Sequence, residues 1–379
     1  MRKSALFFSS LLLLSSCTSH PPQKTTPEEP PAQTQKTPFR PESKQEIFIP
    51  RGIDFSKAPE VIAVGSCADQ NQPQIFWESI QAQKPNLFLF IGDNIYASRP
   101  EQRPFRREYQ KLNDQPAFRA FRKEVPIMAI WDDHDYGLND GGADNPEKDE
   151  ARAEFLRQWP YVRDSISLTQ GGLYHVKYIG GEVEGRRRKK RVTGPTTQVI
   201  MLDTRWYRSP LKKSDSQDPL RKYEPHTDKK TTLLGQEQWE WLEQQLKRPA
   251  DLRILVSSIQ VLADGHGFEK WGLFPHEKER LFHLLKKTGV KNLILVSGDR
   301  HLSAISKVDI PGYGPLYELT ASSLNRPGTL IESDPVYLHN PAITQSNFGL
   351  IKVNYKSRKL EMQILSTDQT LLQSHTIRF

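Results

Sequence analysis

Residues 87–96 read LFLFIGDNIY, a run of five apolar side chains followed directly by Gly92, Asp93 and, at its end, Tyr96. A short apolar run that ends in turn residues is typical of a strand buried on both faces of a sheet. In such sheets the loops that leave the carboxyl ends of the strands gather at one edge and build the functional site. The stretch therefore predicts an α/β fold with a site that includes Asp93.

The same arrangement recurs along the chain. Further apolar runs lead into polar clusters: 61–64 into Gly65-Ser66-Cys67, 125–131 into Asp132-Asp133-His134-Asp135-Tyr136, 293–296 into Ser297-Gly298-Asp299-Arg300-His301 and, more weakly, 254–256 into Ser257-Ser258-Ile259-Gln260. A shared sheet edge would bring three Asp-rich or His-rich loops, a tyrosine and a thiol together. The sequence thus predicts a metal site with more than one ion.

The rest of the chain alternates between helical and strand patterns. Helical spacing predicts helices at 73–83, 105–123, 149–159, 235–246 and 276–288. Period-two alternation predicts a hairpin of 173–179 with 198–203. The C-terminal segments resemble a meander or the second sheet of a sandwich, with strands expected at 315–321, 348–355, 360–365 and 371–378. Helices that alternate with strands predict an α/β class.

Two long polar loops interrupt this alternation. Residues 132–148 are rich in Gly, Asp and Asn, and residues 209–231 are polar and aperiodic. Long loops inside a domain are usually functional, so 209–231 is a candidate lid whose closure the sequence leaves open. Six consecutive basic residues, Arg186–Arg191, predict either a solvated hairpin tip or a contact with anionic lipid or glycan headgroups.

The N-terminus has the features of an export signal. Arg2 and Lys3 precede a short apolar core, which ends in Leu14-Ser15-Ser16-Cys17. Residues 1–17 thus resemble a lipoprotein signal peptide that ends in a bacterial lipobox, and the resemblance implies that cleavage before Cys17 makes this residue the lipidated N-terminus. The alternative is an ordinary secretory signal with an incidental cysteine. Thr18, rather than Asp, follows Cys17, which resembles the pattern of Gram-negative lipoproteins sent to the outer membrane. We therefore expect an exported protein that is lipid-anchored at the outer membrane, in the periplasm or at the cell surface.

Composition sets further bounds on the function. Residues 18–46 are rich in Pro, Gln, Thr, Glu and Lys, which predicts a disordered tether before a domain at 47–379. The formal charge of +8 suits an anionic substrate or surface, but such an excess is also common for solubility. The basic run lacks interleaved aromatics, which disfavours nucleic-acid recognition. Cys67 is the one cysteine beyond Cys17, so we expect no disulfide within the monomer.

The polar clusters hold the right side chains for metals. Hard cations prefer carboxylate oxygen, whereas borderline ions accept imidazole and thiolate, so the mixture suits zinc, iron or manganese, with calcium beside them. One aspartate at the end of a central strand can bridge two ions about 3.5–4 Å apart, as two-metal hydrolases require. An isolated Asp after a strand is usually a turn former. The co-occurrence of Asp132–Asp135 with Asp299–His301 favours the metal interpretation.

These clusters carry a family resemblance. The blocks Gly65-Ser66-Cys67, Gly92-Asp93-Asn94-Ile95-Tyr96, Trp131-Asp132-Asp133-His134-Asp135, Leu202-Asp203-Thr204-Arg205 and Ser297-Gly298-Asp299-Arg300-His301 resemble those of PhoD-like phosphatases. This is the alkaline phosphatase D branch of the calcineurin-like metallophosphoesterases, and the match covers roughly 60–355. The resemblance implies a four-layer αββα sandwich with two mixed sheets. It also implies hydrolysis of a phosphate mono- or diester by direct attack of a metal-bound hydroxide.

The resemblance also assigns roles to residues. Asp93 would bridge the metals, Cys67 and Tyr96 would ligate a ferric ion, and calcium is the expected partner of iron. The full implied ligand set is Cys67, Asp93, Tyr96, Asp133, Asp299 and His301. His134 would protonate the leaving group. Arg205 and Arg300 would hold phosphoryl oxygens, although an ordinary salt bridge is an equal alternative for each.

The sequence also departs from the wider superfamily. Gln260 stands where many metallophosphoesterases have a histidine, which weakens one zinc site and permits calcium. His266 is expected to line the substrate pocket with Asn94 and Gln260, or to replace that histidine in part. The sequence leaves open a phospholipase-type diesterase and a non-catalytic surface-binding lipoprotein of the same fold. We expect a monomer that binds the membrane through its lipid anchor.

Overall fold

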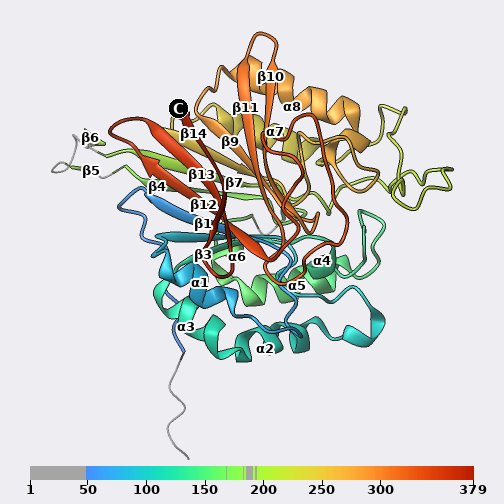
Figure 1. The fold of residues 1–379 in the computed structure, drawn as a ribbon, viewed down its shortest axis with the longest axis horizontal. Helices are drawn as coiled ribbons and strands as arrows, with labels where there is room; N and C mark the ends of the chain where they lie inside the picture. Colours follow the sequence, from blue (N-terminus) through green and yellow to red (C-terminus); the bar gives the residue numbers. More distant parts are fainter. Residues whose placement is uncertain (1–47, 168, 182, 185–190, 193) are drawn as a thin grey trace, which may run out of the picture. The chain divides into compact units, whose positions relative to one another are not determined.

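Two six-stranded mixed sheets lie at the centre of the fold (Figure 1). The first has the order β14-β13-β12-β1-β2-β3, in which β1, β2 and β3 are parallel. Its strands are β1 (Val61–Gly65), β2 (Leu87–Ile91), β3 (Ile127–Ile130), β12 (Asn347–Asn354), β13 (Lys359–Ser366) and β14 (Leu371–Arg378). The apolar runs found in the sequence are therefore its central parallel strands.

The second sheet has the order β10-β11-β9-β8-β7-β4. Its strands β7, β8, β9 and β11 run parallel, whereas β4 and β10 pair antiparallel at its two edges. The strands are β4 (His175–Gly180), β7 (Thr196–Met201), β8 (Leu252–Val256), β9 (Leu293–Ser297), β10 (Ser303–Ile310) and β11 (Gly314–Ala321). A separate small hairpin joins β5 (Val183–Glu184) to β6 (Arg191–Val192).

Helices cover the outer faces of both sheets (Figure 1). The first group consists of α1 (Phe76–Ala82), α2 (Phe105–Asp114), α3 (Pro116–Glu124), α4 (Asp133–Tyr136), α5 (Lys148–Gln158) and α6 (Pro160–Arg163). The second group consists of α7 (Gly235–Leu246) and α8 (Pro275–Thr288). Two single 3₁₀ turns, η1 (Pro100–Gln102) and η2 (Trp271–Leu273), lie in the loops.

Alternating side chains along each strand create two cores. In β8, Ile254 and Val256 belong to the core shared with the first sheet, whereas Leu255 belongs to the core beneath α7 and α8. On the far side, Phe88 and Phe90 of β2 contact Trp77 of α1, with ring centroids 5.5 and 5.7 Å apart. Since the central strands are buried on both faces, the layers are helix, sheet, sheet, helix. The αββα expectation is confirmed.

Three details of the expected secondary structure were wrong or incomplete. The helix expected at 105–123 is two helices, because Pro116 disfavours helical backbone at Gln115, whose ψ is 118°. The strand Ser303–Ile310 was not expected at all. The C-terminal strands divide between the sheets, since β11 joins the second sheet and β12–β14 extend the first as an antiparallel meander.

The computed structural model describes residues 48–379 except 168, 182, 185–190 and 193. The expectations for the signal peptide with Cys17, for the tether at 18–46 and for most of the basic run Arg186–Arg191 lie outside these residues. Within the described part of the chain, no helix has the length and apolarity needed to cross a membrane. Residues 49–379 form one unit by their internal contacts.

Candidate metal centre

The predicted ligands converge at the carboxyl ends of β1, β2, β3 and β9. Among the described residues, four groups have potential ligand atoms that all lie within 4.8 Å of one another. These groups are Cys67–Asp93–His301, Asp93–Asp133–His134, Asp132–Asp133–Asp299 and Asp133–Asp140–Glu269. Because Asp93 and Asp133 each belong to more than one group, the groups form one continuous cluster with room for more than one ion.

The backbone turns sharply at these ligands. Cys67, Asp93, Asp299 and His301 have φ values of 60°, 47°, 69° and 53°, in the left-handed region that non-glycine residues rarely adopt. Such residues cost about 1–3 kcal/mol each and concentrate at functional sites. Gly92 precedes Asp93 with a φ of 122°, and a Cβ there would lie 2.6 Å from the Cβ of Asp132. Only glycine therefore lets the β2 and β3 loops approach so closely.

Sulfur, phenol and imidazole meet on one side of Asp93. The Cys67 Sγ lies 3.5 Å from Asp93 Oδ2 and 3.1 Å from the Ser322 hydroxyl. The Tyr96 hydroxyl lies 3.0 Å from His301 Nε2. The thiol and the phenol that the family resemblance assigns to one ion therefore lie in one neighbourhood. The arrangement fits a cation that accepts thiolate and imidazole ligands.

Carboxylates dominate the other side of Asp93. The backbone N–H of His134 donates to Asp93 Oδ1 at 3.3 Å, and the backbone N–H of Asp140 donates to Asp133 Oδ2 at 2.8 Å. The His134 ring lies against Tyr96 with centroids 4.1 Å apart, and its Nδ1 is 2.7 Å from the Ser98 hydroxyl. An oxygen-rich side of this kind suits a harder cation than the sulfur side does.

The buried acidic groups of the cluster favour bound cations. Burial, followed by neighbouring acidic groups, raises the pKa of Asp93 and of Asp299 well above the usual carboxyl range. Burial raises the pKa of the Cys67 thiol to about 11. Asp132 Oδ2 and Asp133 Oδ1 are buried without a hydrogen-bond partner among the described residues. Metal ions would neutralise these groups and satisfy these oxygens, so the residues fit a multinuclear centre.

A cavity of about 340 Å³ opens above the cluster. Six residues predicted from the sequence line it: Asp93, Asp133, His134, Asp299, Arg300 and His301. Cys67 and Tyr96 are buried and join this set through Asp93 and His301. The cavity therefore has metal ligands in its wall and a histidine and an arginine beside them.

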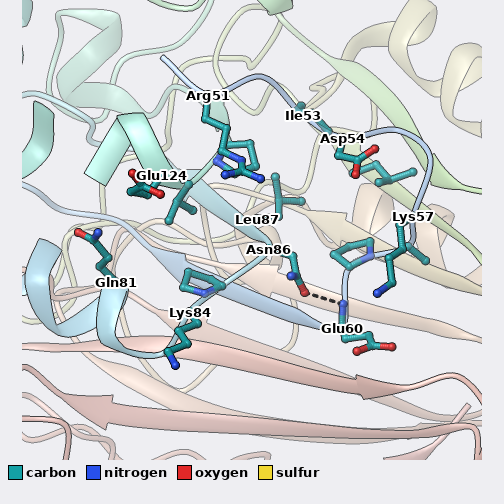
Figure 2. A pocket seen from close by; sticks show the side chains of 16 residues that line it. Arg51, Ile53, Asp54, Lys57, Glu60, Gln81, Lys84, Asn86, Leu87 and Glu124 are labelled. Carbon is teal, nitrogen blue, oxygen red and sulfur yellow. Dashed lines mark hydrogen bonds between the residues drawn. The ribbon is translucent and has the colours of Figure 1, made fainter. Parts of the chain in front are cut away.

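A larger cavity, of about 580 Å³, lies at the amino-terminal ends of β1 and β2 (Figure 2). Its wall includes Arg51, Lys84 and Glu124, and the backbone N–H of Glu60 donates to Asn86 Oδ1 at 3.0 Å. None of the candidate metal groups found in the described residues contains a residue of this wall. Cavity volume alone therefore does not mark the functional site.

Arg205 occupies a different place from the one expected for a phosphate-binding residue. Its side chain is 0% exposed and pairs with Asp132 at 2.5 Å and with Glu269 at 2.7 Å. Asp132 in turn caps α4, which carries Asp133 and His134. This geometry favours a role in positioning the α4 residues. The sequence did not single out Glu269 or Asp140, because neither follows a strand.

The three predicted pocket residues also lie away from the cavity above the metal cluster. Asn94 is fully buried, and its amide donates to the Ile130 carbonyl at 2.9 Å. Gln260 is fully buried as well, and its amide donates to the Thr320 hydroxyl at 3.0 Å. His266 lines an adjacent cavity. The first two have contacts that support the strand ends rather than contacts within the cavity.

Two mixed sheets between helices, with clustered carboxylate, imidazole and thiol ligands at their shared edge, define a metallophosphoesterase-type protein. The family model for PhoD-like phosphatase matches residues 62–159 and 173–364. The chain therefore belongs to the PhoD-like phosphatase family, which confirms the resemblance seen in the sequence.

Individual relatives agree with this assignment. The chain is 22% identical over 288 residues to alkaline phosphatase D of Bacillus subtilis (strain 168), a match that covers 65% of this chain and 46% of the relative. The chain thus spans about half the length of that curated relative. A solved structure of PhoD superposes with a TM-score of 0.62 at 18% identity, covering 86% of this chain and 71% of that one.

A more distant solved structure has the same fold. Purple acid phosphatase PPD1 from yellow lupin (Lupinus luteus) seeds superposes with a TM-score of 0.52 at 13% identity. The match covers 86% of this chain and 55% of that one. At these identities the likeness to both solved structures establishes the fold alone.

Proposed function

We propose that the protein is a metal-dependent phosphoric ester hydrolase that acts on phosphate monoesters or diesters. The observation that carries this proposal is the shared position of Asp93, between the Cys67–His301 group and the Asp133–His134 group. One carboxylate between two ligand sets is the arrangement that a two-metal hydrolase requires. Membership of the PhoD-like phosphatase family supports the same reaction class.

Iron with calcium fits the ligands best, with zinc or manganese as alternatives. Cys67, Tyr96 and His301 would hold the iron, while Asp133 and Asp299 would contribute to an oxygen-rich site. When bound, the ions would supply positive charge for the phosphoryl oxygens and lower the pKa of water so that it can attack phosphorus. The thiol and phenol would be ionised by the metal, which overrides the effect of burial on their pKa values.

His134 is the proposed general acid. Its ring lines the cavity, and the contact of Nδ1 with the Ser98 hydroxyl holds the ring in one orientation. That contact leaves Nε2 to give a proton to the departing alkoxide oxygen. The Tyr96 ring supports the face of the imidazole, so the acid is held rigidly beside the metal ligands.

Arg300 is the proposed phosphoryl clamp. It lies between Asp299 and His301 and lines the cavity, and its guanidinium forms an ion pair with Glu332. A guanidinium held by one carboxylate keeps further donors for phosphoryl oxygens. Arg205 would act through Asp132, by holding α4 in place.

The functional test combines metal analysis with two assays. The mature protein is analysed for bound elements and assayed with p-nitrophenyl phosphate and bis(p-nitrophenyl) phosphate. We expect about two or more metal ions per chain and hydrolysis that stops after chelation and returns with metal. His134→Ala should lower turnover while leaving the bound metal in place. Absence of both metal and turnover would contradict the proposal and favour a non-catalytic binding lipoprotein.

The preferred ester decides between the forms of the enzyme. Faster hydrolysis of phospholipid vesicles than of either soluble ester would favour the phospholipase-type alternative.

We further propose that the chain is exported as a monomeric lipoprotein, anchored at Cys17 to the outer membrane or cell surface. The signal-like sequence before Cys17 supports this. Cys17→Ser should move the protein from the membrane fraction to the soluble fraction, and retention in the membrane would contradict the anchor.

A further inference from the structure

A second cavity of about 250 Å³ adjoins the cavity above the metal cluster. The two cavities share three wall residues, Phe268, Leu330 and Glu332. The Arg300 guanidinium lies 4.4 Å above the Phe268 ring at this boundary and forms an ion pair with Glu332. A molecule whose phosphoryl group contacts Arg300 can therefore place a substituent in the second cavity.

Exposed apolar side chains gather in the wall of the second cavity. Eight large apolar side chains are exposed among the described residues, and three of them line this cavity: Leu220 (44%), Leu330 (41%) and Ile331 (78%). Exposed apolar residues that gather at one place mark a binding site, whereas scattered ones need no explanation. The gathering beside the metal centre indicates an organic group of the substrate.

Three chain segments build this wall. Leu220 comes from the long 209–231 loop, Phe268 follows Gly267, and Leu330 and Ile331 come from the loop before β12. The Tyr223 backbone N–H donates to the Gly267 carbonyl at 2.9 Å, which attaches the 209–231 loop here. A Cβ on Gly267 would lie 2.4 Å from the Leu220 carbonyl oxygen, so glycine permits this approach.

Each charged group of the wall has at least one partner, and Arg221 pairs with Asp218 at 3.9 Å. Asp334 Oδ2 accepts the backbone N–H groups of Asp264 and Gly265, at 3.0 and 2.6 Å. Glu332 is paired with Arg300. Asp218 Oδ1 accepts the Leu220 backbone N–H at 2.9 Å. Because each of these carboxylates already has one partner and Arg221 adds a positive charge to the wall, the cavity favours an uncharged occupant over a cationic one.

Among the described residues, two buried polar atoms of the wall lack a hydrogen-bond partner, Glu332 Oε2 and His266 Nε2. His266 Nδ1 accepts the Phe268 backbone N–H at 3.2 Å, so the neutral ring carries its proton on Nε2. Nε2 is buried and has no hydrogen-bond partner within the described part of the chain. A buried donor without a partner is costly, and a ligand that brings an acceptor would satisfy it.

We propose that the second cavity is a subsite for a bulky, uncharged and mainly apolar organic group of the phosphate ester, with His266 Nε2 as its hydrogen-bond donor. The inference rests on the proposed function, because it places the phosphoryl group in the cavity above the metal cluster. This subsite makes the enzyme selective for esters of large apolar alcohols, alkyl or aryl, over esters of small alcohols.

Binding of phosphonates to the mature, metal-loaded protein tests this directly. Calorimetry compares methylphosphonate with hexylphosphonate and phenylphosphonate, which the enzyme does not hydrolyse. At least one of the larger compounds should bind about tenfold more tightly than methylphosphonate, since burial of two to three methylenes is sufficient for this. Equal binding of all three would overturn the proposal, and the larger compound that binds more tightly shows whether the group is alkyl or aryl.

Variants of the apolar wall locate the effect. Ile331→Ser and Leu220→Ser should each reduce the preference for the larger phosphonate by about threefold or more, since each removes apolar contact area. Leu371→Ser is the matched control, because Leu371 is also exposed, at 52%, but lies in β14. It should leave the preference unchanged. A preference that survives in both wall variants contradicts the assignment.

Two further probes test the polarity of the subsite. The compound 6-aminohexylphosphonate, which has a cationic tail, should bind more weakly than hexylphosphonate. Tighter binding would identify a carboxylate-lined cation subsite instead.

The compound 2-butoxyethylphosphonate, which carries an ether oxygen, tests the hydrogen bond from His266. It should bind the wild type about two- to tenfold more tightly than hexylphosphonate does, and this gain should be absent in His266→Phe. Equal ratios in both proteins would remove His266 from the subsite.

The proposal and the hydrolase assignment can fail separately. Turnover of bis(p-nitrophenyl) phosphate without any preference among the phosphonates would overturn the subsite alone. Absence of turnover together with absence of phosphonate binding would overturn both.

Discussion

Both ends of the central parallel strands have a cavity, but within the described part of the chain only the carboxyl end combines its cavity with a cluster of metal-ligand side chains. The amino-terminal end has the larger cavity, about 580 Å³ against about 340 Å³ at the carboxyl end (Figure 2). The carboxyl end has the buried carboxylates and four ligands with left-handed backbone, whereas the wall at the other end has one left-handed residue, Lys84. Converging ligands and local strain, rather than volume, therefore mark the functional end of this fold.

The strongest test of this contrast removes the shared ligand. Asp93→Asn should lower hydrolysis well over a hundredfold and reduce the bound metal, because even residues that only support a metal ligand contribute about 10–100-fold. Steady-state kinetics and elemental analysis measure the two effects. Normal turnover with a full metal content would show that Asp93 is not the bridging ligand.

The buried ion pairs beneath the metal cluster come next. Arg205→Met leaves Asp132 buried without its cation and leaves Glu269 with Arg208 alone, at 3.4 Å, so it should destabilise the fold by about 3–5 kcal/mol. Denaturant unfolding measures this change. The control is Arg157→Met, which breaks the exposed pair with Glu154 and should scarcely alter stability. Similar stability of both variants would show that the buried pairs do not hold the metal edge together.

A buried histidine away from the metal ligands predicts a dependence on pH. Burial lowers the pKa of His175 to about 4, below that of the unfolded chain, about 6.5. The unfolded state then binds the proton first as the pH falls. The stabilising contribution is complete above pH 6.5 and is lost towards pH 4, by about 3 kcal/mol.

His175→Gln isolates this contribution. Unfolding free energies of wild type and variant are compared between pH 4 and 7, because the difference cancels the effect of the metal-edge carboxylates. The stability gap between the two proteins should narrow as the pH falls. A gap that is constant across this range would assign the pH dependence to other groups.

Backbone strain at the metal edge gives a smaller effect. Gly92→Ala should destabilise the protein by about 1–3 kcal/mol, since alanine disfavours a φ of 122° and its Cβ meets Asp132. Gly289→Ala is the matched control, because its φ of 67° is also left-handed but its added Cβ meets no atom within 4 Å. Gly92→Ala should also lower metal affinity, and Gly289→Ala should not. Equal effects of the two variants on metal affinity would show that the left-handed backbone at Gly92 does not support the metal site.

The smallest effect is expected at the amino-terminal end. Glu124→Gln changes a charge in the larger cavity, far along the sheet from the ligands, and should leave both turnover and metal content unchanged. The same assays as for Asp93→Asn apply. A clear loss of hydrolysis would show that the larger cavity takes part in function, which would break the comparison.

The sequence by itself determined the parallel strands and the ligands that follow them. Asp93, Asp133 and Asp299 were predictable because an apolar run specifies a buried strand, and the residue after its end lies at a common edge. Pro116 by itself indicates a break in the helix expected at 105–123, but the spacing of the apolar residues around it favours one continuous helix. The lipoprotein signal remains a prediction from sequence alone.

Only the tertiary structure decided which polar residues face the cavity. Arg205 and Gln260 stand in polar blocks that follow strands, yet both are fully buried, because their partners come from distant segments: Asp132 precedes α4 and Thr320 lies in β11. The surroundings of His266 come from three loops that are far apart in the sequence and together form the wall of the second cavity. Burial and pairing depend on contacts between segments far apart in the chain, and local residue patterns do not specify such contacts.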